Sequence, residues 1–79
     1  MRARVTVTLK AGVLDPQGQA ITGSLKSLGF GNIGGVRQGK VFDVELEDAD
    51  PTDARVSLAA MCEKLLANTV IENYRVELL

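Results

Sequence analysis

The chain has 79 residues, of which 46% are hydrophobic and 24% charged, and its formal net charge is -1. This composition is typical of a small globular protein, and we predict one domain over residues 1–79. The near-zero charge offers no electrostatic attraction to nucleic acid or to anionic lipid, so neither is an expected partner. No stretch approaches the roughly 18 consecutive apolar residues of a membrane span. We therefore expect a soluble, cytoplasmic protein without a membrane partner.

Small size limits the stability that this chain can reach alone. Size scaling indicates that folding buries only about 60% of the surface of so short a chain. The single cysteine excludes a disulfide within the chain, and the absence of histidine excludes the usual zinc sites. The sequence therefore predicts association with other chains.

The first part of the chain predicts a strand followed by a helix. Residues 2–10 alternate between apolar and polar side chains, as in a half-buried strand. Asp15 and Pro16 suit the N-cap and the first position of a helix over about residues 16–28, and Gly29 is placed to end it. The apolar positions of this helix are Ala20, Ile21, Leu25 and Leu28.

The second part predicts two strands, a helix and a last strand. Residues 33–37 and 41–47 form short runs that join near Gly39, which favours a hairpin. Asp50 and Pro51 repeat the cap and proline, and the helix they begin is expected to close at Asn68 in the left-handed conformation. Its apolar stripe consists of Ala54, Leu58, Met61, Cys62, Leu65 and Leu66. Residues 74–79 alternate again and predict the final strand.

This order of elements is that of the split βαβ arrangement. The expected fold is therefore α+β and ferredoxin-like, βαββαβ, with a four-stranded antiparallel sheet and two helices on one face. The opposite face of the sheet would be polar and uncovered. We expect the chain to form a homodimer through this face or through strand edges.

Two glycine-rich motifs have the wrong context for nucleotide binding. Residues 29–34 satisfy G-x-G-x-x-G but follow a predicted helix, whereas a dinucleotide fingerprint follows a strand. Residues 34–40 satisfy most of a phosphate-binding loop, but Val41 replaces its Ser or Thr and begins a strand. We read both motifs as turns and predict no cofactor-binding residues.

The remaining candidates for chemistry are also weak. Cys62 lies on an apolar helix face, and the chain has no histidine to activate its thiol. The carboxylates of Asp43, Glu45 and Glu47 are expected to form a solvated ladder rather than a metal site, since neighbours on one strand lie roughly 7 Å apart. Three aromatic residues are too few for a base-stacking RNA platform. No catalytic or metal-binding residues are predicted.

Several segments carry a resemblance to a known family. The chain resembles PurS, the small subunit of phosphoribosylformylglycinamidine synthase, a glutamine-dependent enzyme of purine biosynthesis. The matching segments are Leu9–Gly18, Ser27–Phe30, Val36–Lys40, Cys62–Asn68, Val70–Glu72 and Tyr74. It departs from the family pattern at Thr69, where proline is expected, and at Gly34–Gly35, where charged residues are more usual.

The resemblance implies a non-catalytic subunit of an ATP- and glutamine-dependent carbon–nitrogen ligase complex. Such a subunit bridges the glutaminase and synthetase subunits and assists ammonia transfer between them. ATP and magnesium are expected on the synthetase partner. Whether the assembly contains a homodimer or a homotetramer stays open, as does the path of ammonia.

Motif density and loop position give a set of candidate interface residues. They are Gly12, Leu14, Asp15, Pro16, Gln17, Gly18, Arg37, Gly39, Lys40 and Asn68. Capping alone would account for Asp15, Pro16 and Asn68. The alternative function is a regulatory small-molecule-binding module similar to the ACT domain, which has the same order of elements and binds ligands near its first loop.

Overall fold

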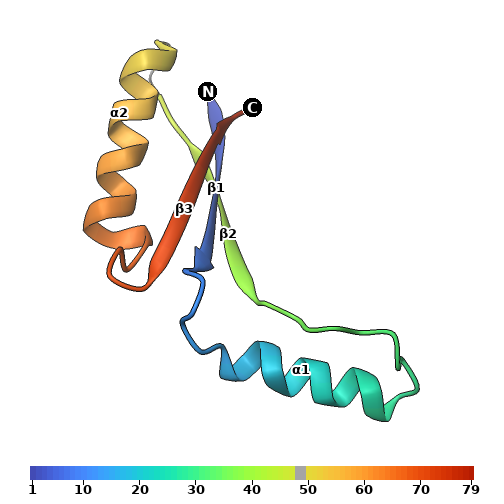
Figure 1. The fold of residues 1–79 in the computed structure, drawn as a ribbon. Helices are drawn as coiled ribbons and strands as arrows, with labels where there is room; N and C mark the ends of the chain where they lie inside the picture. The colour runs from blue at the N-terminus through green and yellow to red at the C-terminus, as the bar shows by residue number, and fades with distance from the viewer. Residues whose placement is uncertain (48–49) are drawn as a thin grey trace.

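The computed structural model describes residues 1–47 and 50–79. Three strands, two α-helices and one π-helical turn follow one another along the chain (Figure 1). They are β1 (Arg2–Leu9), α1 (Pro16–Ser27), β2 (Gly39–Glu45), α2 (Pro51–Met61), the π-helical turn η1 (Cys62–Leu66) and β3 (Glu72–Leu78). None of the helices in these ranges has both the length and the apolar run needed to cross a membrane.

The sheet is built around its first strand. The strand order is β2-β1-β3, and β1 pairs antiparallel with both neighbours. Val5 lies opposite Phe42 on one side and Val76 on the other. Because side chains alternate between faces, this register places Ala3, Val5 and Val7 on one face, and all three are buried.

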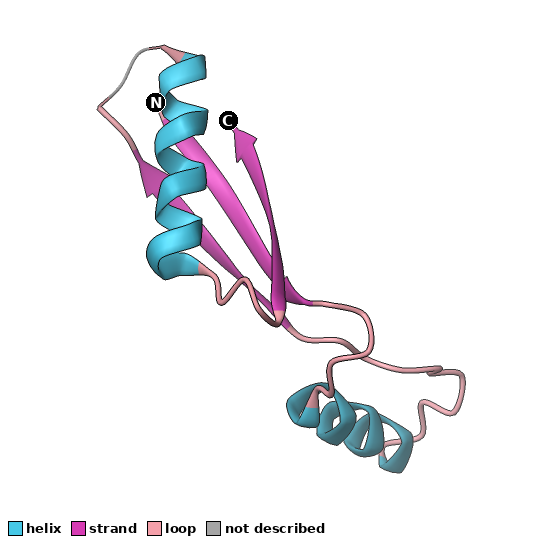
Figure 2. Ribbon diagram, turned by 60° about the vertical axis from the view of Figure 1, so that its left-hand side comes forward, coloured by secondary structure: helices cyan, strands magenta, loops and turns pink. Residues whose placement is uncertain are grey.

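Helix α2 covers that apolar face. Since β2 and β3 lie on opposite sides of β1, the chain that connects them must cross the sheet, and α2 makes this crossing (Figure 2). Ala54, Leu58 and Cys62 recur at every fourth position and are fully buried against the strands. Asp50 begins the helix by accepting a 2.8 Å hydrogen bond from the backbone amide of Thr52. The core of the protein lies between α2 and β1.

The connection from β1 to β2 does not cross the sheet. The strands are antiparallel neighbours, so residues 10–38 leave and rejoin the sheet at the same end. Residues 11–38, which we call the arm, contain α1 and a return segment, and the arm extends beyond that end of the sheet (Figures 1 and 2). Gly18 is the only buried residue of α1, and Gly29, with φ of 104°, follows the helix as expected.

The arm gives the molecule an elongated shape. Its radius of gyration is 16.0 Å, whereas a compact chain of this length has a value of about 12 Å. The principal extents are 48 × 25 × 14 Å. The folded chain therefore shields less of its surface than a compact domain would.

The expected four-stranded sheet with two helices on one face is wrong. The sheet has three strands, and residues 33–37 form no strand but run alongside α1. Gly34 and Gly35 explain this, because glycine loses entropy in a strand and has no side chain to pack. Helix α1 lies beyond the end of the sheet, and among the described residues α2 and η1 supply the helical side chains that pack on the sheet.

Two local expectations also fail. Gly39 is the first residue of β2 and does not sit in a hairpin turn, because residues 33–37 form no strand. No non-glycine residue in the described ranges has positive φ, so Asn68 does not close its helix in the left-handed conformation. Instead the last turn widens into η1, which ends with Ala67 in an extended conformation.

Leu58→Ala tests the location of the core. Leu58 is the largest fully buried side chain, so its truncation leaves a cavity and should lower the free energy of unfolding by about 2–5 kcal/mol. Val56→Ala on the exposed side of the same helix is the control and should change it by less than about 0.5 kcal/mol. Urea titration measures both, and equal effects would contradict this core.

Candidate protein–protein interface

Asp15 joins the two ends of the arm. Its side chain is buried, although it carries a charge. One carboxylate oxygen accepts a 2.9 Å hydrogen bond from the amide of Gly18, and the other accepts a 2.7 Å bond from the amide of Gln38. These two bonds, that of Gln38 foremost, hold the pKa of the Asp15 carboxyl below its usual value. Asp15 therefore caps α1 and also fixes the residue that precedes β2.

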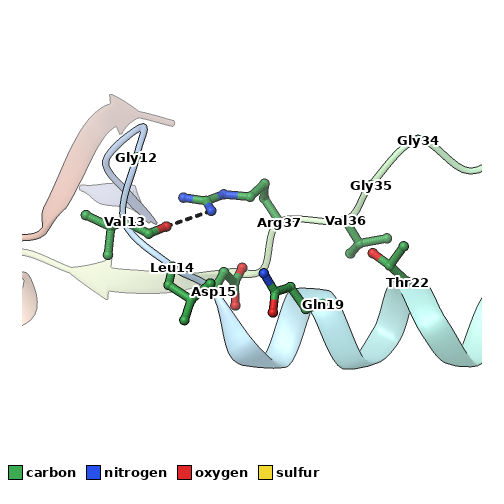
Figure 3. A pocket seen from close by; sticks show the side chains of 10 residues that line it. All are labelled: Gly12, Val13, Leu14, Asp15, Gln19, Thr22, Gly34, Gly35, Val36 and Arg37. Atoms are coloured by element: carbon green, nitrogen blue, oxygen red, sulfur yellow. Dashed lines mark hydrogen bonds between the residues drawn. The ribbon is translucent and has the colours of Figure 1, made fainter.

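Arg37 makes a second connection between the same segments. Its guanidinium donates a 2.8 Å hydrogen bond to the carbonyl of Val13 (Figure 3). It also donates a 3.1 Å bond to the carbonyl of Lys10. The two acceptors belong to the outgoing chain, and Arg37 to the returning one. Together with Asp15, Arg37 forms what we call the arm joint, and the joint sets the direction in which α1 leaves the sheet.

Glycine is required at two close approaches beside the joint. A Cβ atom on Gly18 would collide with the carbonyl oxygen of Val36 and lie 2.6 Å from the Asp15 carboxylate. A Cβ atom on Gly39 would lie 2.7 Å from the carbonyl oxygen of Val7. Both distances are too short for a real side chain, so these glycines permit the chain segments to touch.

Lys40 and Asn68 meet at Glu72, close to the arm joint. One carboxylate oxygen of Glu72 lies 3.8 Å from the ammonium of Lys40. The other accepts a 2.7 Å hydrogen bond from the amide of Asn68, whose side chain in turn accepts from the amide of Val70. The ammonium of Lys10 donates to the carbonyl of Thr69. The loop after η1 is thereby held against the end of the sheet.

The predicted interface residues therefore gather at the end of the sheet from which the arm leaves. Gly12 lies in the turn after β1 with φ of 86°, and Leu14, Pro16 and Gln17 lead into α1 with exposed side chains. Sequence reasoning did not assign Glu72 or Lys10 to this set. Glu72 stands among the segments that resemble the family, but its two partners come from other elements, and no local spacing predicts such contacts.

A groove of about 510 Å³ lies between the outgoing and returning segments of the arm (Figure 3). The charged groups that line it are those of Asp15 and Arg37, and both are engaged with backbone groups of the chain. A ligand would have to displace these bonds. The groove thus has the character of a structural joint, and the geometry does not favour an ACT-like ligand site.

The described residues offer no arrangement for catalysis. Cys62 is fully buried, and burial raises the pKa of its thiol, so the nucleophilic thiolate is disfavoured. No group of three acidic, cysteine or histidine side chains in residues 1–47 and 50–79 is placed to hold a metal ion.

Comparison with known proteins agrees with the resemblance seen in the sequence. The family model "PurS: Phosphoribosylformylglycinamidine (FGAM) synthase" matches residues 2–79. The PurS subunit of Mycobacterium leprae is 52% identical over 75 residues, which cover 95% of this chain and 91% of that one. The structure of Bacillus subtilis PurS has 47% identity and a TM-score of 0.87, covering 96% of this chain and 94% of that one.

A second solved structure places a similar chain in a larger assembly. It is entitled "Structure of PurLQS from Thermotoga maritima" and has 29% identity and a TM-score of 0.90. The match covers 99% of this chain and 95% of the other. The whole chain described above, arm included, is therefore comparable with a chain of that assembly.

Asp15→Ala should loosen the arm joint without unfolding α2. The amides of Gly18 and Gln38 lose their acceptor, so their hydrogen exchange should accelerate by about tenfold or more. Asp50→Ala is the matched control, because Asp50 caps α2 through Thr52 alone. Exchange measured by NMR should then change at Thr52 and remain slow at Gln38. Unchanged protection of Gln38 in Asp15→Ala would contradict the joint.

The contribution of Asp15 should also depend on pH. Its folded-state pKa lies below the ordinary value of 3.8, so the stabilisation is fully present above that value and is lost as pH falls through the folded pKa. The difference in unfolding free energy between the parent chain and Asp15→Asn should therefore be largest at neutral pH and shrink in acid below 3.8. A difference that grows on acidification would contradict this sign.

Proposed function

The chain belongs to the PurS family of phosphoribosylformylglycinamidine synthase subunits in purine biosynthesis, and we propose that it bridges the glutaminase and synthetase subunits of that enzyme. The observation that carries the proposal is its match over nearly the whole length to a chain of the PurLQS assembly. We place this role in the cytoplasm. The bridge itself is non-catalytic.

The chemistry of the two expected partners supports this division of labour. Glutamine hydrolysis needs an activated nucleophile, and ATP needs a cradle of backbone amides or cations around its phosphates. The thiol of Cys62 is buried, and residues 34–40 lead into strand β2 rather than into a helix. The glutaminase would therefore supply the nucleophile, and the synthetase would hold ATP and magnesium.

Transfer of ammonia gives a physical reason for such a bridge. Ammonia that escapes into water at neutral pH is protonated and loses the lone pair with which it attacks. A subunit that holds two active sites in a fixed relation shortens the exposed path and raises the effective concentration of ammonia at the second site. The chain would assist transfer by positioning its partners.

The region around the arm joint, at the end of the sheet, is the proposed contact surface. Leu14, Gln17 and Lys40 have exposed side chains there and can reach a partner. Asp15, Gly18 and Arg37 bind other parts of the chain, so their role in assembly would be to position the arm. Pro16, Gly12, Gly39 and Asn68 shape the same surface.

Self-association is also part of the proposal. The folded chain exposes 5562 Å², whereas a compact monomer of this mass exposes about 4,600 Å². The excess of about 950 Å² per chain would give about 1,900 Å² between two copies, which lies in the range of stable interfaces. We therefore propose a homodimer as the unit that meets the two larger subunits.

Reconstitution with the glutaminase and synthetase subunits tests the bridge. Native mass spectrometry should detect a complex of all three that does not form when this chain is omitted. Lys40→Ala should weaken the complex. The midpoint of thermal unfolding of the variant chain should move by no more than about 4 °C, since exposed ion pairs contribute little to stability. The rate of glutamine-dependent turnover should fall as the complex weakens, whereas turnover with added ammonium should be retained.

Arg55→Ala is the control for this experiment, because Arg55 is exposed on α2, away from the arm joint. It should leave both the complex and the glutamine-dependent rate unchanged. A ternary complex that forms equally well without this chain would contradict the bridge. Equal weakening by Lys40→Ala and Arg55→Ala would contradict the proposed contact surface.

A further inference from the structure

The turn between η1 and β3 is built from residues that do not favour turns. Asn68 suits its first position, but the residues that follow, Thr69, Val70 and Ile71, are all β-branched. Such side chains are most favourable in strands, where neighbouring side chains pack against them. Val70 instead is 82% exposed. It buries little surface within its own chain, and departures from local preference are expected at functional positions.

Hydrogen bonds hold this turn, residues 68–72, in one conformation. The carbonyl of Asn68 accepts bonds of 3.0 and 2.7 Å from the amides of Ile71 and Glu72. The side chain of Asn68 accepts a 3.2 Å bond from the amide of Val70. The carboxylate of Glu72 accepts a 2.7 Å bond from the amide of Asn68. The side chain of Val70 is therefore carried on a backbone that is already ordered in the free chain.

Lys10 fastens the turn to the sheet. Its ammonium donates a 2.8 Å hydrogen bond to the carbonyl of Thr69, and its amide donates a 2.9 Å bond to the carbonyl of Ile71. The carbonyl of Lys10 accepts a bond from Arg37 of the arm joint. The turn thus lies at the end of the sheet from which the arm leaves, within the proposed contact surface (Figure 1).

We propose that Val70 is an anchor that inserts into an apolar pocket of one of the two larger subunits, and that this pocket has a carboxylate at its rim to pair with Lys40. The inference rests on the bridging role proposed above and names a contact residue for it. A side chain on an ordered turn loses little conformational entropy on binding, so burial of its apolar surface contributes directly to affinity. Apolar anchors of this kind, surrounded by a polar rim, supply much of the affinity of protein interfaces.

The charges beside Val70 favour a partner with an acidic rim. The side chain of Lys40 is 54% exposed, and its ammonium lies 3.8 Å from the carboxylate of Glu72, whose side chain is 16% exposed. An ammonium has three donors, so Lys40 can also donate to a carboxylate of the partner. The nearby carboxylate of Glu63 already accepts a 2.9 Å bond from the hydroxyl of Tyr74. The accessible charge at this place is therefore that of Lys40.

Val70→Ala tests the anchor in the reconstituted complex. The loss of two methyl groups should raise the dissociation constant for the glutaminase or for the synthetase, measured separately, about fivefold or more. Val56→Ala is the matched control, because Val56 is 67% exposed on α2, and it should leave both constants unchanged. Both variants should keep the midpoint of thermal unfolding of the parent chain within about 4 °C, since neither valine is buried. Equal dissociation constants for the two variants would overturn the proposal.

Protection of a cysteine at the same position reports whether the turn is covered. Val70→Cys is close to valine in size, and its thiol should react readily with iodoacetamide in the free chain, whereas Cys62 is fully buried. Adding the larger subunit that Val70→Ala weakens should slow alkylation at residue 70 about tenfold or more. Val56→Cys is the control and should react at the same rate with and without that subunit. Protection that rises with the concentration of this chain alone would assign the turn to contact between copies and overturn the proposal.

The outcomes separate the anchor from the bridge. A ternary complex that forms as tightly with Val70→Ala as with the parent chain would overturn the anchor and leave the bridge standing. Failure of the parent chain to join the two larger subunits would overturn both. Loss of affinity in Val70→Ala without protection of Val70→Cys would show that residue 70 acts from outside the interface, and would overturn the anchor as well.

Discussion

The antiparallel pairing of β1 with both β2 and β3 determines where the helices of the molecule lie. Because β2 is a direct antiparallel neighbour of β1, the chain between them leaves and returns at one end of the sheet. This connection does not have to cross the sheet. Because β3 lies on the other side of β1, the chain from β2 to β3 must pass over the sheet. Helix α2 therefore packs on the sheet and contributes to the core, whereas α1 does not. The division into a packed unit and a projecting arm follows from strand order.

Because α1 does not pack on the sheet, other contacts must hold its direction. The contacts of the arm joint do so. Asp15 accepts amide hydrogens from both ends of the arm, and Arg37 donates to two carbonyls of the outgoing chain. Charge-assisted bonds to backbone groups fix chain geometry more strongly than contacts between exposed side chains. The same engagement leaves these charges unavailable to a ligand. Asp15 and Arg37 thus orient the arm. A fixed orientation of the arm would support assembly with other chains.

Local signals in the sequence predicted local structure well. Asp15 with Pro16 and Asp50 with Pro51 marked both helix starts, Gly29 marked the end of the first, and alternation marked β1. The predictions that failed concern contacts between segments that are distant in the sequence. Periodicity identified the apolar stripe of α1 but could not say which surface covers it, and the run before Gly39 was read as a strand although it has no neighbour to pair with. The candidate residues lie together at the end of the sheet from which the arm leaves, yet Glu72, which links Lys40 to Asn68, could not be found from spacing within one segment.

The exposed apolar side chains of α1 link the stability of the arm to what covers them. In a separate copy Ile21 and Leu28 lie in water, and a helix of 12 residues with two glycines has little intrinsic stability, so a partner that covered these side chains would add to the order of the arm. Any partner that binds the ordered arm and not the loosened one stabilises it by mass action, in proportion to the logarithm of its concentration. In the proposed assembly, a partner that covers α1 would therefore reinforce the direction that the arm joint sets within one chain.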